Sequence, residues 1–289
     1  MELRSVAALI EASRKMPIWE AILCSDLEED TPEQRAASLE KMRMLWQVMQ
    51  DSAAGYDGSQ RSLSGLSGGD GEKYTQMMSS GKMMCGTYLN DAIATALKVS
   101  ECNACMKRIV AAPTAGSCGV IPAVLIPYRK EYPDTPEEEM LHALYVTGGF
   151  GNSIAERASV SGAEAGCQAE IGAASAMAAA ALVYLRGGSP EACGNACAMA
   201  LKNLLGLVCD PVAGLVEVPC VKRNVVGVVN AISCANMALA GIVSRIPPDE
   251  VIDAMAEVGS SMSADLRETA RGGLAATPTG KRIAAERAE

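Results

Sequence analysis

Histidine and aromatic side chains are scarce in this 289-residue chain. It contains one histidine, one phenylalanine and two tryptophans, and aromatic residues make up 3% of the sequence. The single histidine, His142, falls inside an expected helix beside Leu141, where a structural role is the preferred interpretation. A reaction that needs a histidine base would therefore take it from another chain or use another group. The apolar residues are mainly Ala, Met, Leu and Val, and such small side chains suit closely packed helices.

The chain also has fewer positively than negatively charged residues. It contains 25 Lys and Arg residues and 34 Asp and Glu residues, the formal net charge is −9, and no long basic block occurs. This balance argues against nucleic acid and against an anionic membrane surface as partners. The apolar run from Ile171 to Leu185 is shorter than the roughly 20 residues of a membrane-spanning helix. It is bracketed by Glu170 and Arg186 and is interpreted as a buried helix.

Cysteine, in contrast, is abundant, with 11 residues. An odd number cannot pair completely within one chain, and no apolar signal segment follows Met1. We therefore expect a cytoplasmic protein whose cysteines are thiols or metal ligands.

Helix start signals recur along the chain. Thr31-Pro32-Glu33-Gln34 has the pattern of a capping box with proline at the first helical position. Thr135-Pro136 repeats the pattern, Ser189-Pro190 opens a helix expected to run to Gly206, and Pro247-Pro248 opens another.

Strand signals are few and short. Val120–Ile126 and Val225–Val229 are β-branched runs, but prolines weaken the first as a strand. The sequence predicts an all-α protein with little or no sheet. We expect one domain over residues 1–289, with residues 1–55 as a helical segment packed on the rest.

Three Gly- and Ser-rich stretches are expected to form loops between these helices. They are Ser62–Asp70, Ala112–Gly119 and Thr147–Asn152. Such loops bring backbone amides and hydroxyls close to a small ligand, and backbone N–H groups suit a carboxylate. None matches a nucleotide-binding fingerprint. The alternative is that they only connect helices.

Cys167, Cys209 and Cys220 lie in unusual surroundings. Cys167 follows a glycine just before the Ala-rich run, Cys209 precedes Asp-Pro, and Cys220 follows a proline. The two latter positions indicate turns, and a helix start stabilises a thiolate through its dipole and free amides. The alternative is that they are small buried hydrophobic residues.

The remaining cysteine patterns are less informative. Cys102-x-x-Cys105 has the spacing of a redox pair or half a zinc site, but no second pair completes it. Cys193 and Cys197 are four residues apart on an expected helix and are interpreted as core. Cys118 lies in a Gly-rich loop and remains ambiguous. No lysine sits in a pyridoxal phosphate cradle, so we expect no pyridoxal phosphate.

Several long motifs together resemble the alpha chain of bacterial iron–sulfur-dependent L-serine dehydratase. They are Ala112–Ala123, Ser161–Glu170, Gly206–Gly214, Val218–Cys220 and Arg267–Ala275. The resemblance covers essentially the whole chain and implies conversion of L-serine to pyruvate and ammonia. It also implies a 4Fe–4S cluster held by cysteines, which correspond to Cys167, Cys209 and Cys220.

In such a cluster the fourth iron would be open and could hold the substrate hydroxyl as a Lewis acid. The resemblance further implies a helical catalytic chain and a separate beta chain as partner. Some one-chain members end in a cysteine that reaches the cluster. The segment from Gly280 onward has no cysteine and is expected to be a solvated tail.

The two first loops are expected to hold the carboxylate of L-serine, and the sequence leaves the general base unassigned. The predicted substrate-binding residues are Ser62, Ser64, Gly65, Thr114, Ser117 and Asn152. Two other functions stay open, an L-cysteine desulfidase and a non-catalytic iron–sulfur sensor or scaffold.

Overall fold

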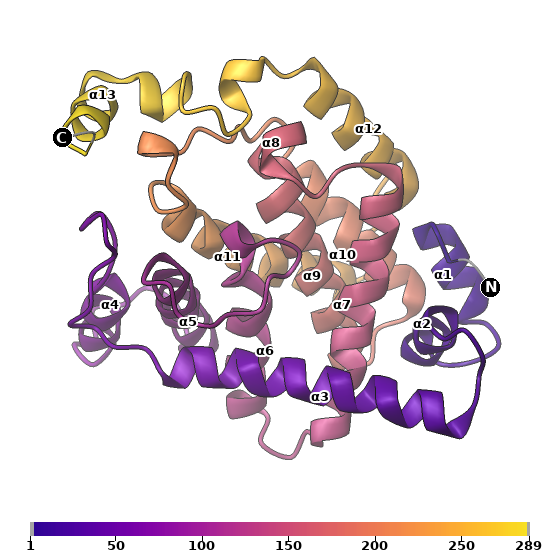
Figure 1. The fold of residues 1–289 in the computed structure, drawn as a ribbon. Helices are drawn as coiled ribbons and strands as arrows, with labels where there is room; N and C mark the ends of the chain where they lie inside the picture. The colour runs from indigo at the N-terminus through magenta and orange to yellow at the C-terminus, as the bar shows by residue number, and fades with distance from the viewer. Residues whose placement is uncertain (1–2, 288–289) are drawn as a thin grey trace.

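The computed structural model describes residues 3–287, and in this part of the chain helices joined by turns and loops form the fold (Figure 1). The α-helices are α1 Val6–Ala12, α2 Ile18–Asp26, α3 Pro32–Ala54, α4 Asp70–Met78, α5 Thr87–Ala104, α6 Val120–Glu131, α7 Glu137–Arg157, α8 Gly162–Ala165, α9 Ala173–Leu185, α10 Pro190–Lys202, α11 Cys220–Leu239, α12 Pro248–Ser261 and α13 Pro278–Ala285. Shorter helical turns are η1 Ala115–Ser117, η2 Gln168–Gly172, η3 Val212–Gly214, η4 Ala264–Leu266 and η5 Gly273–Ala276. No strand occurs among residues 3–287, so the all-α prediction is confirmed.

Most of the predicted helix starts are correct. Thr31 accepts a hydrogen bond from the Gln34 amide at 3.2 Å, and α3 begins at Pro32. Ser189 caps α10 in the same way. Thr135 does not cap α7, because Pro136 takes the N-cap position and makes no side-chain bond. The helix α10 ends at Lys202, short of the expected Gly206.

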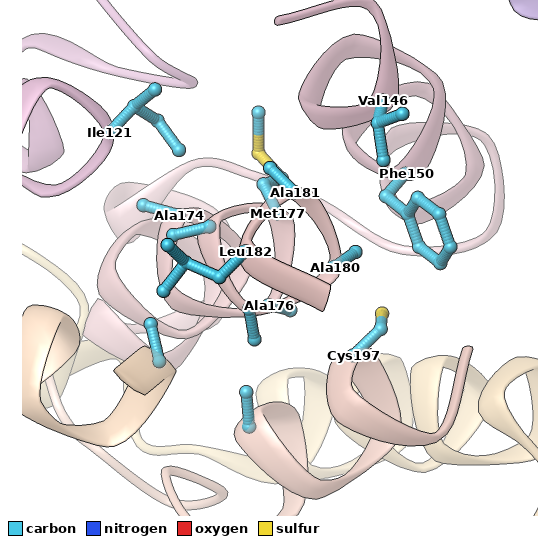
Figure 2. Packing of buried hydrophobic residues seen from close by; sticks show 14 of the residues in the cluster. Ile121, Val146, Phe150, Ala174, Ala176, Met177, Ala180, Ala181, Leu182 and Cys197 are labelled. Atoms are coloured by element: carbon cyan, nitrogen blue, oxygen red, sulfur yellow. The ribbon is translucent and has the colours of Figure 1, made fainter. Parts of the chain in front are cut away.

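Helix α9 forms the centre of the core. It packs against α6, α7, α10 and α11, and its side chains from Ala173 to Val183 are all buried. Figure 2 shows α9 alanines between Val146 and Phe150 of α7 and Cys197 of α10. Small side chains let four neighbouring helices approach α9 closely. The segment Gln168–Leu185 is apolar and long enough to span a membrane, but 83% of it is buried inside the protein, which supports its interpretation as a core helix.

The stretch Thr147–Asn152 is not a loop, and this prediction was wrong. It lies in the middle of α7. A Cβ atom at Gly149 would clash with Ile22 of α2, and one at Gly151 would lie 2.9 Å from the Met177 methyl of α9. These glycines therefore allow close helix packing and do not shape a ligand loop.

The two β-branched runs also lie in helices. Val120–Ile126 forms the start of α6, and Val225–Val229 lies within α11. Residues 120–125 and Val228 are buried in the helix packing, while Val226 and Val229 are exposed, so the helices form despite the weak strand preference of valine and isoleucine.

His142 occupies a buried position on α7, as expected for a structural residue. Its ring stacks on Trp19 of α2 with the ring centroids 3.6 Å apart. Neither ring nitrogen has a hydrogen-bond partner among residues 3–287, although carboxylates of Glu138 and Glu139 lie within 4 Å. The ring therefore contributes to the packing of α7 against α2 through its stacking on Trp19.

Candidate functional site

Three turns around the start of α11 carry the three predicted ligand cysteines. Cys167 lies in the turn between α8 and η2, Cys209 lies in the extended segment before η3, and Cys220 is the first residue of α11. Their exposed fractions are 3%, 3% and 8%. All three thiols are thus buried, although only Cys220 belongs to a regular helix.

Each turn has a local cause. Gly166 takes a φ of +77°, which a residue with a Cβ rarely adopts, and this redirects the chain between α8 and Cys167. Cys209 is fixed by its backbone, since its amide donates to the Leu266 carbonyl at 2.8 Å and its carbonyl accepts from Glu268 at 2.7 Å. Pro219 directly precedes Cys220 and occupies the N-cap position of α11.

The three thiols influence one another. Burial raises the pKa of Cys167 to about 11 and that of Cys220 to about 12, and it also raises the pKa of Cys209. Cys167 and Cys220 each raise the pKa of Cys209 further by electrostatic repulsion.

The segments that carry these cysteines are joined directly. The Gln168 amide donates to the Leu207 carbonyl at 2.9 Å, and Arg223, three residues after Cys220, donates to the Val208 carbonyl at 2.7 Å. The fold therefore brings the three cysteine-bearing segments together.

The donor set suits an iron–sulfur cluster. No group of three or more His, Cys, Asp or Glu side chains in residues 3–287 is close enough to hold a single metal ion. A cluster makes a different demand, because each thiolate binds its own iron and the sulfurs lie farther apart than ligands of one ion. Three buried thiols with no histidine among them fit that chemistry.

Glu170 is a partly buried acidic side chain beside these thiols, and the exposed Glu268 is a second acidic residue close to Cys209. A Cβ at Gly162 would lie 2.7 Å from Glu170 Oε2 and 3.1 Å from the Cys209 sulfur, so both groups border the same glycine. Burial raises the pKa of Glu170, while a hydrogen bond from Thr114 lowers it. The carboxyl is therefore placed where it could accept or donate a proton next to the cysteines.

The predicted loop Ala112–Gly119 lies directly over Glu170. A Cβ at Gly116 would be 3.3 Å from both Glu170 carboxylate oxygens. Thr114 and Ser117 join in a capping box, with their hydroxyl oxygens 3.1 Å apart. The fold therefore brings these two predicted residues to the cysteines.

Asn224 of α11 holds the Ala112–Gly119 loop in place through hydrogen bonds. Its side-chain amide donates to the carbonyls of Gly116 at 2.8 Å and Cys220 at 3.0 Å, and its oxygen accepts from the Gly119 amide at 2.9 Å. Asn224 is 1% exposed. It therefore links the loop to the turn that carries one of the cysteines.

The other predicted loop, around Ser62, is held by Glu217. Ser62 and Ser64 donate to Glu217 Oε2 at 2.6 and 2.7 Å, and Gly65, with a φ of +75°, makes the tight turn between them and Ser67. Glu217 is buried and lies three residues before Cys220. The hydroxyls expected to bind a substrate carboxylate thus already face a carboxylate.

Asn152 is not brought to this loop pair by any observed interaction. It is exposed on α7, in the helix that replaces the expected loop. The C-terminal segment lies closer to the site than expected. Helix α13 packs on η3, and Arg287 donates to the Ser64 carbonyl at 2.7 Å, so the segment is not merely a solvated tail.

Four of the other cysteines lie in the helix packing. Cys193 and Cys197 are buried at 1% and 0% exposure, as predicted for core residues. Cys118 points to the carbonyl of Val99, and burial raises its pKa to about 12. Cys102 likewise approaches a backbone carbonyl of α3, so its thiol is directed into helix packing.

Three residues of the site were missed in the sequence. Glu170 and Asn224 lie within or directly after the motifs that carry the cysteines, so proximity in sequence was an available signal. Glu217 lies between two motifs. For Glu217, the only local sign was that a polar residue lies near a candidate ligand in the sequence. The bonding partners that reveal the role of each of the three residues come from distant segments.

Comparison with known proteins gives a consistent result. A sequence model described as "Serine dehydratase alpha chain" matches residues 13–275. The "Probable L-serine dehydratase, alpha chain" of Bacillus subtilis (strain 168) is 48% identical over 97% of this chain and 93% of that protein. The "L-serine dehydratase, alpha chain" of Peptoniphilus asaccharolyticus is 50% identical over 71% of this chain and 70% of its own. "L-serine dehydratase TdcG" of Escherichia coli is 48% identical over 62% of this chain and 40% of that protein.

Proposed function

We propose, from the premise that the chain belongs to the serine dehydratase alpha chain family, that it is the catalytic subunit of an L-serine dehydratase. Such an enzyme converts L-serine to pyruvate and ammonia. The observation that carries the proposal is that the segments of Cys167, Cys209 and Cys220 are bonded together beside Glu170, with all three thiols buried. The names of the relatives support the substrate, and "alpha chain" supports a beta chain as partner.

Cys167, Cys209 and Cys220 would hold the proposed 4Fe–4S cluster as thiolates. When bound, a cluster with an open iron supplies a Lewis acid that stabilises a hydroxyl as it leaves. The reaction also needs a base for the α-proton. Loss of that proton and of the β-hydroxyl gives aminoacrylate, which becomes an imine and is hydrolysed to pyruvate and ammonia.

Glu170 is the residue we assign to the α-proton. Its carboxylate lies between the cysteines and the loop that carries Thr114 and Ser117. A carboxylate in such a partly buried place can take a proton from a neighbouring carbon acid and return it to product. The single histidine, His142, packs between α2 and α7 and is not part of this arrangement.

The two loops suit opposite ends of the amino acid. The amides and hydroxyls of Thr114–Gly119 suit the substrate carboxylate. Glu217, with Ser62 and Ser64, carries negative charge and suits the ammonium group, since a second carboxylate there would be repelled. This assignment reverses the expected role of the Ser62 loop and keeps both loops at the substrate.

The decisive experiment is anaerobic preparation with and without a beta chain, followed by iron and sulfide counts and substrate assays. We expect about four irons per chain, pyruvate release from L-serine, and weak activity of the isolated chain. Sulfide release from L-cysteine at a higher rate would favour a desulfidase. A cluster without turnover of either amino acid, with the beta chain present, would favour a sensor.

A further inference from the structure

One arginine joins two of the three cysteine-bearing segments. Arg223 lies on α11 three residues after Cys220, which places both residues on the same side of the helix. Its side chain reaches the Cys209 segment directly. It donates from Nη1 to the Val208 carbonyl at 2.7 Å and from Nη2 to Asp210 Oδ1 at 2.8 Å. The Cys167 segment is joined to the same stretch, because the Gln168 amide donates to the Leu207 carbonyl at 2.9 Å.

The hydrogen bonds of Arg223 lie on both sides of Cys209. Val208 and Asp210 are the residues before and after this cysteine, so a single guanidinium fixes the chain on both sides of it. A planar guanidinium can do this because its N–H groups point in fixed, divergent directions. A lysine ammonium at the same place could not hold the same set of acceptors.

Asp210 extends the connection to the C-terminal segment. Its Oδ2 accepts from the Leu274 amide at 2.8 Å, and Gly273, with a φ of +56°, packs directly on its carboxylate. The Arg223 and Asp210 side chains are only 14% and 5% exposed. Breaking such a pair by removing one partner leaves an uncompensated buried charge and is strongly unfavourable.

Arg223 also places a positive charge beside Cys209, because its guanidinium binds the residues on both sides of that cysteine. Thiols must lose their protons to bind iron, and three thiolates in a buried space repel one another. A fixed cation beside them offsets part of that repulsion.

We infer that Arg223 is the positioning residue of the cysteine site: its guanidinium holds the Cys209 segment, and with it the Cys167 segment bonded to that stretch, against the start of α11 and supplies charge that balances the bound thiolates. The inference rests on the proposed cluster for its charge role. Its geometric role concerns the protein without any cluster and can be judged separately.

The test compares Arg223→Gln, Arg223→Lys and a control, Arg157→Gln. Arg157 also binds an aspartate with two nitrogens, Asp253, but joins α7 to α12. In apoprotein, hydrogen exchange measured by mass spectrometry should become faster over residues 206–212 and 266–276 in Arg223→Gln. The Cys209 and Leu274 amides lie in these segments, and exchange there should not change in the control.

The second readout is the loaded protein. We expect Arg223→Gln to lower the affinity for iron by about 10- to 100-fold and to shift the reduction potential of any remaining cluster to more negative values. Arg223→Lys should also bind iron less well but keep a potential close to that of the parent protein, since it keeps the charge. This variant carries the test if Arg223→Gln does not fold.

Three outcomes decide the question. Faster exchange in the two segments together with lost iron supports the inference. Unchanged exchange, iron content and potential in Arg223→Gln would overturn it. A parent protein that binds no iron and sulfide would refute the proposed cluster, while hydrogen exchange would still decide whether Arg223 holds the segments together.

Discussion

The helices around α9 and the segments around the start of α11 are both buried, yet different interactions hold them. Around α9 the contacts are between small apolar side chains, with neighbours such as Phe150 and Cys197 filling the space between helices (Figure 2). Around the start of α11, Asp210, Glu217 and Asn224 are buried at 4%, 6% and 1% exposure, and each has hydrogen-bond partners far away in sequence.

This difference determines what each region tolerates. Apolar packing depends on volume and shape, so substitutions of similar size change stability by modest amounts. A buried hydrogen-bond network depends on particular donors and acceptors, and removing one partner leaves another unsatisfied. We therefore expect substitutions in the core to affect mainly stability, and substitutions at the site to affect mainly cluster and turnover.

The largest expected effect distinguishes the three proposed ligand cysteines from the buried cysteines of the core. Replacing Cys167, Cys209 or Cys220 by serine should abolish cluster iron and L-serine turnover, because a hydroxyl does not replace the ligand thiolate. Cys197→Ser should keep turnover per folded molecule and lose about 1–3 kcal/mol of unfolding free energy, the cost of burying a hydroxyl without a partner. Iron counts, pyruvate assays and denaturant titrations measure these outcomes. Full iron content and activity in Cys209→Ser would refute the ligand assignment.

The next effect concerns Glu170 alone. Glu170→Gln keeps the size of the side chain and removes its ability to accept a proton, so kcat should fall by about 100-fold or more while iron content stays unchanged. Glu164→Gln is a suitable control, since that side chain is exposed on α8 and accepts a hydrogen bond from Ser159. Equal kcat values for Glu170→Gln and the parent protein would assign the base elsewhere.

A smaller effect is expected from replacing Asn224, which holds the Ala112–Gly119 loop in place. Asn224→Ala leaves the Gly119 amide and the Gly116 carbonyl without their partner. Unfolding free energy should fall by about 2–3 kcal/mol, and KM for L-serine should rise because the loop is less well fixed. Urea titration and steady-state kinetics measure the two effects. A change in stability with no change in KM would show that the loop does not contribute to substrate binding.

The smallest effects come from two adjacent glycines of α7. Gly149→Ala places a methyl group against Ile22 and should destabilise the protein by about 1–3 kcal/mol through overpacking. Gly148→Ala meets open space and should stabilise it by up to about 1 kcal/mol. Neither should change turnover. Thermal unfolding of the pair gives the comparison, and a lower stability of Gly148→Ala would contradict the packing described here.

Local sequence signals determined most of the secondary structure. The Thr31 and Ser189 caps and the prolines that follow them mark helix starts, because a cap bond forms between residues three positions apart. A different local signal gave a wrong prediction at Thr147–Asn152, since three glycines in six residues are typical of a loop. The approach of α2 to Gly149 and of α9 to Gly151 explains two of these glycines, while Gly148 meets open space.

The cysteine motifs identified the three proposed ligands from the sequence, but their meeting and surroundings were decided by the tertiary structure. The Asn224 bond to Gly116 spans 108 positions, and the Ser62 bond to Glu217 spans 155. No periodicity or local propensity encodes which distant carbonyl or hydroxyl will satisfy a buried polar group. That choice follows from how α5, α9 and α11 pack. This packing places Glu170 and Arg223 at the cysteine-bearing segments, the Ala112–Gly119 loop over Glu170, and the Ser62 loop on Glu217.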